Sequence, residues 1–152
     1  DFEERHLNEI VEGTYELMLH HVKISNIRFT VMTEAKADLV RCSANQIKQA
    51  CVALLVNASE AVTENGEISI RTRNSDSTTV RIEISDNGSG IAPEDVPHIF
   101  EPFFTTKQDA SGIGLGLSIV HGIVQNHNGR VEVDSAVGRG TTISIILPLK
   151  TE

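Results

Sequence analysis

The chain has 152 residues, a length that suits one domain and is short for two. Hydrophobic residues make up 39% of it and charged residues 22%, a composition typical of a globular protein rather than a disordered one. It has 13 lysines and arginines against 21 aspartates and glutamates. The resulting net charge of −8 argues against nucleic acid as the main partner, because nucleic-acid binding depends on neutralising phosphates.

The sequence also bears on the compartment. No apolar run approaches the roughly 20 residues needed to cross a bilayer, and no signal-peptide pattern opens the chain. Cys42 and Cys51 form no CxxC motif and have no nearby histidine at zinc-ligand spacing, so we expect two reduced thiols. We therefore expect a cytoplasmic segment with no direct membrane contact, and leave open whether a parent protein is membrane-anchored.

The apolar pattern predicts three helices and about five strands. In chain order these are a helix over 5–21, a strand around 27–31, a helix over 43–63, strands around 68–70 and 80–85, a helix over 115–127, and strands around 131–133 and 143–147. A loop-rich stretch from 86 to 114 carries most of the glycine and proline. Because the strands follow one another in hairpin pairs rather than alternating strictly with helices, we expect an α/β (α+β) two-layer sandwich. Its helices should cover one face of a mixed five-stranded sheet.

Two polar side chains continue the buried face of predicted strands. Asp86 has the parity of Ile82 and Ile84, and Thr141 has the parity of Ile143. A carboxylate aimed at the interior requires a hydrogen-bond donor, which an amine such as the exocyclic group of adenine would supply. The alternative for Asp86 alone is an ordinary cap of the turn that follows it. Two inward polar side chains at strand ends together favour a pocket that these side chains line.

Asn57 lies at the edge of the apolar face of the second helix, roughly 90° from the centre of its apolar stripe. A side-chain carbonyl at that place could bind a hard cation such as Mg²⁺. The helix pattern alone favours the alternative, a solvated asparagine.

A glycine-spaced segment, Gly112-Ile113-Gly114-Leu115-Gly116-Leu117, runs directly into the third predicted helix. Glycines permit close backbone approach, and the first turn of a helix offers free N–H groups, so the segment suits a phosphate. It does not follow a strand, and no P-loop Gly-Lys-Ser/Thr is present. The dinucleotide-binding and P-loop sites are therefore disfavoured.

Five segments resemble the sequence boxes of sensor histidine kinases, in the order and spacing of that family. They are LLVNASEA around Asn57, DNGSGI at 86–91, IFEPFFTTK at 99–107, GIGLGLSIV at 112–120 and GRGTT at 138–142. The chain thus resembles the catalytic ATP-binding domain of a two-component kinase over about 43–147. The pocket is similar to those of gyrase B and the heat-shock ATPase chaperones, which implies the Bergerat-type ATP-binding fold.

Taken over residue by residue, the resemblance implies that Asn57 binds Mg²⁺ and that Asp86 accepts the adenine amine. Around the purine it implies Gly88, Gly90 and Ile91, with Thr141 near adenine. The other implied ATP contacts are Phe104, Thr106, Lys107, Gly112, Gly114, Leu115, Gly116 and Leu117. Lys107 could reach the terminal phosphates or be a solvated loop lysine. Phe100, Phe103 and Phe104 would form the aromatic box that anchors a lid, and we expect at least one of them in the core.

The chain departs from the family at Ala53. Many histidine kinases carry a second asparagine there, one helical turn before the magnesium ligand, and the related ATPases carry a glutamate base. Absence of a carboxylate argues against self-contained ATP hydrolysis, which needs a base to position water. Absence of the asparagine puts part of the metal or phosphate network in question. Glu60 is further along the same helix edge and is a poor substitute.

The implied reaction is transfer of the ATP γ-phosphoryl group to a histidine of a separate phosphoacceptor and dimerisation domain, and the implied further partner is a response regulator. None of the six histidines has the context of an acceptor, and His127 is most simply a core-edge residue. We expect residues 1–21 to be the end of a dimerisation helix or linker and residues 22–152 to be the catalytic domain. Two other functions stay open: a nucleotide-binding pseudokinase, and a serine kinase of the anti-sigma type.

Overall fold

The computed structural model describes residues 1–24, 26–101 and 115–151. Its helices are α1 (Leu7–Ile24), α2 (Ala44–Ala61) and α3 (Leu115–Asn126), with a short 3-10 helix, η1 (Val96–His98). Its strands are β1 (Glu3–His6), β2 (Arg28–Thr33), β3 (Leu39–Cys42), β4 (Glu67–Arg73), β5 (Thr79–Asp86), β6 (Arg130–Ala136) and β7 (Gly140–Pro148). Among these described residues, no helix is long and apolar enough to span a membrane.

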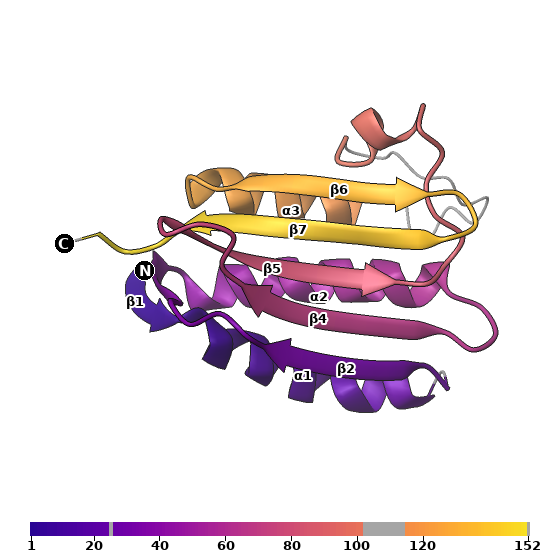
Figure 1. Cartoon of the computed structure of the whole chain (residues 1–152), viewed down its shortest axis with the longest axis horizontal. Coiled ribbons are helices and arrows are strands. Elements are labelled where there is room, and N and C mark those ends of the chain that lie inside the picture. Colours follow the sequence, from indigo (N-terminus) through magenta and orange to yellow (C-terminus); the bar gives the residue numbers. More distant parts are fainter. Residues whose placement is uncertain (25, 102–114, 152) are drawn as a thin grey trace.

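Five strands form the main sheet, in the order β2-β4-β5-β7-β6. β2 runs parallel to β4, and the other neighbouring strands are antiparallel. The helices α1, α2 and α3 all cover one face of this sheet (Figure 1). The predicted two-layer α/β sandwich with a mixed five-stranded sheet is therefore confirmed.

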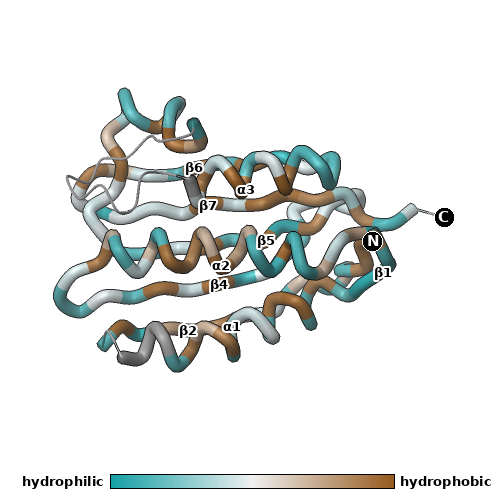
Figure 2. The backbone as a smooth tube through the Cα atoms, turned by 180° about the vertical axis from the view of Figure 1, so that it is seen from behind, coloured by the Kyte–Doolittle hydropathy of each residue, from teal (hydrophilic) through white to brown (hydrophobic). Residues whose placement is uncertain are grey.

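The core lies between the sheet and the three helices. Alternate residues of β5 (Val80, Ile82 and Ile84) are buried on the helix side, as period-two patterning requires. α2 buries Ile47, Leu54 and other residues of one stripe, and the Ser43 side chain caps its first turn by accepting a hydrogen bond from the Gln46 N–H. Seen from the helix side, apolar and polar turns alternate along α2 (Figure 2).

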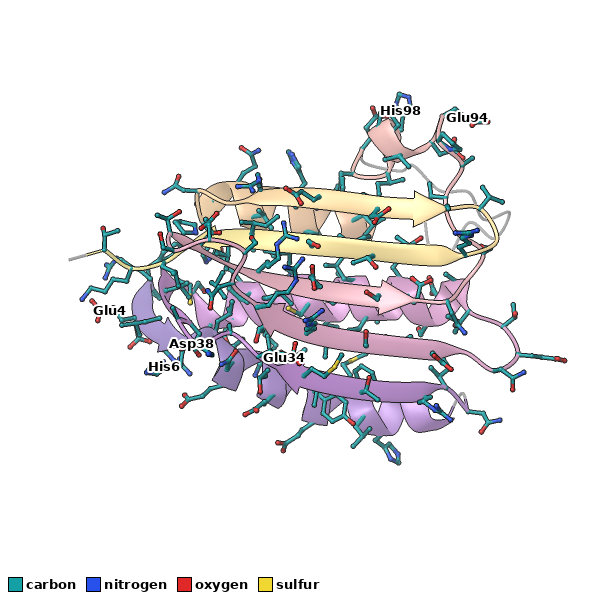
Figure 3. The ribbon with its side chains drawn as sticks, in the orientation of Figure 1. Glu4, His6, Glu34, Asp38, Glu94 and His98 are labelled. Atoms are coloured by element: carbon teal, nitrogen blue, oxygen red, sulfur yellow. The ribbon has the colours of Figure 1, made fainter. Side chains whose placement is uncertain are left out.

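The first residues form a structure that the sequence pattern did not predict. Residues 3–6 do not begin the first helix but pair as β1 with β3 in a separate two-stranded sheet. The helix begins at Leu7, where the N–H groups of Leu7 and Asn8 donate to the backbone and side-chain oxygens of Asp38. His6 Nδ1 also lies 2.9 Å from Asp38 (Figure 3). Both strands have only four residues, and β1 is exposed throughout, so it carries no hydrophobic periodicity.

His127 joins the end of α3 to the start of α2. Its ring is 5% exposed, its Nδ1 lies 2.8 Å from the Ile123 carbonyl oxygen, and its Nε2 accepts a hydrogen bond from the Ser43 N–H at 3.1 Å. Because a carbonyl can only accept, the proton is on Nδ1. The prediction that His127 is a core-edge histidine is confirmed.

Candidate nucleotide-binding site

The predicted site residues gather at one end of the sheet. The C-terminal end of β5, the β6–β7 turn and the C-terminal end of α2 meet there (Figure 1). Asp86 pairs directly with Thr141 across β5 and β7, and Thr141 pairs in turn with Ser135 of β6. On the other side, Asp86 pairs with Ile68 of β4. These four residues form one row across the helix-facing side of the sheet. We call its three polar members, Asp86, Thr141 and Ser135, the polar row.

The Asp86 carboxyl is half-buried at the end of the core. Burial raises its pKa above the ordinary value, and hydrogen bonds from the backbone N–H groups of Gly88 and Thr141 oppose that rise. The Gly88 N–H donates to Asp86 Oδ1 at 2.8 Å. A partly desolvated carboxylate gains most from a further donor, so this side chain suits a ligand that carries an amino group.

Gly88 and Gly90 allow the loop after β5 to lie close to its neighbours. A Cβ at Gly88 would be 2.5 Å from the Ala61 carbonyl oxygen, at the end of α2. A Cβ at Gly90, whose φ is +79°, would be 2.1 Å from the Ala136 carbonyl oxygen in β6. Only glycine fits either place without a shift of the backbone. The loop is therefore held between α2 and the β6–β7 turn.

Asn57 lies on α2 one turn before Ala61, the residue that contacts the Gly88 loop. The side chain is half-buried, and no described residue hydrogen-bonds to it. Its amide oxygen is thus available to a ligand beside the loop. Among the described residues, no group of three or more His, Cys, Asp or Glu side chains could hold a metal ion. Mg²⁺ bound through phosphates, water and one protein oxygen does not need such a group, so Asn57 fits the ion.

Ala53, one turn further back on α2, faces the start of α3. A Cβ built at Gly116 would lie 3.8 Å from the Ala53 Cβ, an ordinary van der Waals distance. Ala53 also packs against the hydrophobic core. The position that departs from the family pattern therefore lies between α2 and the start of α3, with room there for a further methyl group.

The remaining predicted contacts fall into two groups. Phe104, Thr106, Lys107, Gly112 and Gly114, together with Phe103 of the aromatic box, lie outside the described residues. Leu115, Gly116 and Leu117 form the first turn of α3, and Leu117 packs on the core. Phe100 also packs on the core, as we expected for at least one phenylalanine of the box. The nucleotide contacts in both groups stay predictions.

Sequence reasoning did not single out Asn87. Its Oδ1 accepts a hydrogen bond from the Glu67 N–H at 2.8 Å, and its Nδ2 donates to the Asn65 carbonyl oxygen at 3.0 Å. Asn87 thereby holds the turn before β4 against the loop after β5. Its position within DNG marked a turn, but no periodicity shows which backbone groups such a side chain contacts.

Ser135 was also missed. Its hydroxyl lies 2.8 Å from Thr141 Oγ1 and accepts a hydrogen bond from the Ile91 N–H at 2.8 Å. The parity of Val131 and Val133 could have shown that Ser135 faces the same side as Thr141.

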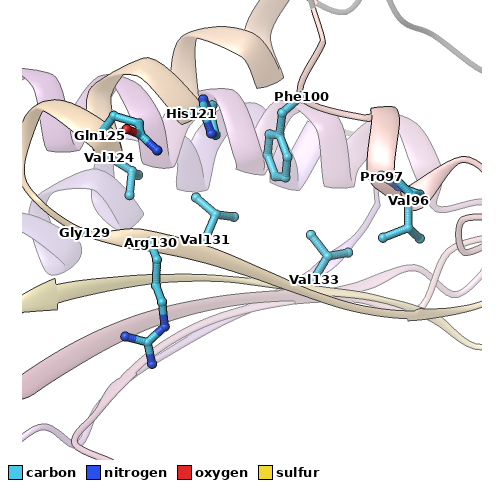
Figure 4. A pocket seen from close by; sticks show the side chains of 10 residues that line it. All are labelled: Val96, Pro97, Phe100, His121, Val124, Gln125, Gly129, Arg130, Val131 and Val133. Carbon is cyan, nitrogen blue, oxygen red and sulfur yellow. The ribbon is translucent and has the colours of Figure 1, made fainter.

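A groove of about 430 Å³ lies apart from these residues, between η1, α3 and β6 (Figure 4). Its lining is mixed, with apolar residues such as Val131, Val133 and Phe100 beside polar ones such as Gln125 and Arg130. His121 also lines it, with its ring centre 6.1 Å from that of Phe100. None of the residues assigned to the nucleotide lines this groove.

Residues 42–151 match the family described as histidine kinase-, DNA gyrase B- and HSP90-like ATPases. Sporulation kinase E of Bacillus subtilis is 32% identical over 149 residues, which cover 98% of this chain and 20% of that protein. Sensor kinase CckA of Brucella abortus is 42% identical over 127 residues, covering 74% of this chain and 13% of that protein.

Among solved structures, the catalytic domain of histidine kinase ThkA matches with a TM-score of 0.84 at 33% identity, covering 98% of this chain and 96% of that one. ThkA in complex with the response regulator protein TrrA matches with a TM-score of 0.82 at 32% identity, covering 98% of this chain and 42% of that one.

The chain belongs to the family of histidine kinase-, DNA gyrase B- and HSP90-like ATPases. Within it, the resemblance to the catalytic ATP-binding domain of sensor histidine kinases is confirmed. The chain spans about a fifth of sporulation kinase E and less of CckA.

Proposed function

We propose that this chain is the ATP-binding catalytic domain of a two-component sensor histidine kinase. It binds ATP with Mg²⁺ and places the γ-phosphoryl group for transfer to a histidine of a phosphoacceptor domain. The observation that carries the proposal is the half-buried Asp86 carboxylate, paired with Thr141 at the open end of the core.

In this proposal each described residue has a distinct task. Asp86 accepts the adenine amine, and Gly88 and Gly90 shape the purine site by letting the loop after β5 lie close to α2 and β6. Asn57 holds Mg²⁺, which supplies charge neutralisation at the phosphates. The amide groups of the first turn of α3 hold the phosphate chain, together with Lys107, which lies outside the described residues. Phosphoryl transfer depends mainly on positioning and charge stabilisation, so these groups suffice for the protein's share.

Ala53 limits the chemistry. Without a carboxylate at this place on α2, the domain has no base there to activate water, so transfer to a histidine is favoured over hydrolysis. Ala53 also supports a second candidate, a pseudokinase that binds nucleotide without phosphoryl transfer. A serine kinase of the anti-sigma type shares the pocket and is a third outcome of the test.

We also propose the setting of the domain. The similarity to ThkA, which was solved in complex with the response regulator protein TrrA, supports a response regulator as the downstream partner. Leu7 and Val11 of α1 are fully buried in the shared core, so within residues 1–21 the link toward the dimerisation helices would run through β1. The proposed location is the cytoplasm.

The first test is calorimetric titration of a non-hydrolysable ATP analogue, with and without Mg²⁺. We expect magnesium-dependent binding with a Kd on the order of 1 μM, about −8 kcal/mol. The second test mixes the chain with a histidine phosphoacceptor domain and radiolabelled ATP. Transfer to histidine supports the kinase, binding without transfer supports the pseudokinase, and transfer to a serine of a partner protein supports the third candidate. No binding in either condition would refute all three.

A further inference from the structure

The Ser135 hydroxyl is the centre of a small hydrogen-bond network at the polar row. It accepts from the Ile91 N–H at 2.8 Å and donates to the Gly140 carbonyl oxygen at 3.1 Å. It also lies 2.8 Å from the hydroxyl oxygen of Thr141. Ser135 is half-buried, and Thr141 is only 8% exposed.

The direction of the bond between the two hydroxyls follows from counting protons. A serine hydroxyl has one proton and two lone pairs. The carbonyl of Gly140 can only accept, so it takes the Ser135 proton. The bond at 2.8 Å must then use the proton of Thr141. Ser135 is saturated, with one hydrogen bond donated and two accepted, and Thr141 has no proton left to offer a ligand.

The consequence concerns the neighbouring carboxylate. Asp86 pairs directly with Thr141, and both side chains are on the helix-facing side of the sheet. An ionised carboxylate only accepts hydrogen bonds, and Thr141 oriented by Ser135 also only accepts. This edge of the polar row therefore offers acceptors alone. It suits an amino group and opposes a keto oxygen at the same place.

We propose that Ser135 determines purine specificity by holding the Thr141 hydroxyl as an acceptor, which favours a 6-amino purine over a 6-keto purine. This inference rests on the proposed function, because it concerns the same nucleotide site. Ser135 acts through Thr141 and is a positioning residue.

The chain contains a matched pair on the opposite face of the same sheet. Ser85 and Thr142 are cross-strand partners, and their hydroxyl oxygens are also 2.8 Å apart. They occupy the positions next to Asp86 and Thr141, but face away from the helices. Removing the Ser85 hydroxyl therefore makes the same chemical change on β5, the other neighbour of β7, without touching the polar row.

The experiment measures the affinities of ATP and inosine triphosphate for the chain by calorimetry with Mg²⁺. Inosine triphosphate has a keto oxygen where ATP has its amino group. We expect the unaltered chain to prefer ATP. In Ser135→Ala, Thr141 regains a free proton, and the preference should fall roughly tenfold. Ser135→Thr, which keeps the hydroxyl, and Ser85→Ala should both retain the preference.

A second variant covers the case in which Ser135→Ala fails to fold after the Ile91 N–H loses its acceptor. Thr141→Val keeps the shape of the side chain and removes the hydroxyl. Because the unaltered hydroxyl only accepts, ATP binding should weaken several-fold, while inosine triphosphate, which the acceptor opposes, should bind at least as tightly as before. Weakening of inosine triphosphate instead overturns the inference.

The other outcomes separate this inference from the proposed function. An unchanged preference in a folded Ser135→Ala variant overturns the inference and leaves ATP binding intact. Equal binding of both nucleotides by the unaltered chain also overturns the inference and leaves ATP binding intact. Binding of neither nucleotide refutes the proposed function and this inference together.

Discussion

Gly88 lies directly against the last turn of α2, where a Cβ would be 2.5 Å from the carbonyl oxygen of Ala61. The obstacle is backbone, so neither side can yield without moving the loop or the helix. The Ser89 N–H also donates to that carbonyl oxygen, at 3.3 Å. The contact fixes the distance between Asn57 on α2 and Asp86 on β5, the two side chains that the proposed function assigns to opposite ends of the nucleotide.

Gly88→Ala should therefore destabilise the fold by about 1–3 kcal/mol, the usual effect of overpacking, and weaken ATP binding. Urea unfolding and calorimetry measure the two effects. Gly122→Ala in α3 is the matched control, since nothing lies within 4 Å of its added Cβ. That control should be more stable by about 1 kcal/mol, because alanine favours a helix interior. Equal stability of both variants would contradict the close contact.

Asp86→Asn should weaken ATP binding by roughly 10- to 100-fold, because the adenine amine loses a charged acceptor. The same substitution should weaken ATP binding but stabilise the fold at neutral pH. Burial raises the pKa of Asp86, so the folded state binds its proton more tightly, and this carboxyl lowers stability as pH rises through its titration range. Asparagine does not titrate, so the free energy of unfolding of the variant does not fall in this way as pH rises. Thermal unfolding at several pH values should show its advantage over the unaltered chain growing from acidic to neutral pH, and a constant difference would argue against the shift.

Asn57→Ala should reduce the gain in ATP affinity that Mg²⁺ provides by roughly tenfold, while leaving magnesium-free binding nearly unchanged. Titrations with and without the ion separate these quantities. Asn45→Ala, an exposed asparagine in the first turn of the same helix, is the control and should behave as the unaltered chain. If Asn57→Ala weakened binding equally in both conditions, Asn57 would have another role than holding the metal.

His127→Ala should lower the free energy of unfolding by about 1–3 kcal/mol, because the partly buried Ser43 N–H loses its acceptor and the start of α2 is loosened. Phe2 also loses its stacking partner, whose ring centre is 4.6 Å away. His20→Ala, at an exposed position of α1, should leave the stability unchanged within about 0.5 kcal/mol. Guanidinium unfolding of the two variants tests the difference. Similar free energies of unfolding would show that the contacts of His127 do not stabilise the fold.

The sequence predicts the layers of this fold because strands such as β4 and β5 have one buried face, which gives a period-two pattern. The alternation of Val80, Ile82 and Ile84 places Asp86 on the helix side, and the structure agrees. β1 gives no such signal, because Glu3–His6 is exposed throughout and is held by its pairing with β3 and by polar side-chain contacts such as His6 with Asp38.

The same contrast holds at the site. Asp86 and Thr141 could be found because an inward polar residue interrupts a regular pattern. Asn87 could not, because its two contacts are with backbone groups about 20 residues away in sequence. Ser135 lies between these cases. Its parity is readable, but the direction of its hydrogen bonds depends on where the Gly140 carbonyl and the Ile91 N–H lie in space.

The polar row is also the place where the hydrophobic core stops. Each row of the sheet before it is covered by helix side chains, and a flat purine laid over Asp86 and Thr141 would add one more layer to that stack. Ligand and fold would then be linked thermodynamically. A nucleotide at 100 times its Kd would raise the free energy of unfolding by about 2.7 kcal/mol, so the melting temperature of the domain would report how full its site is.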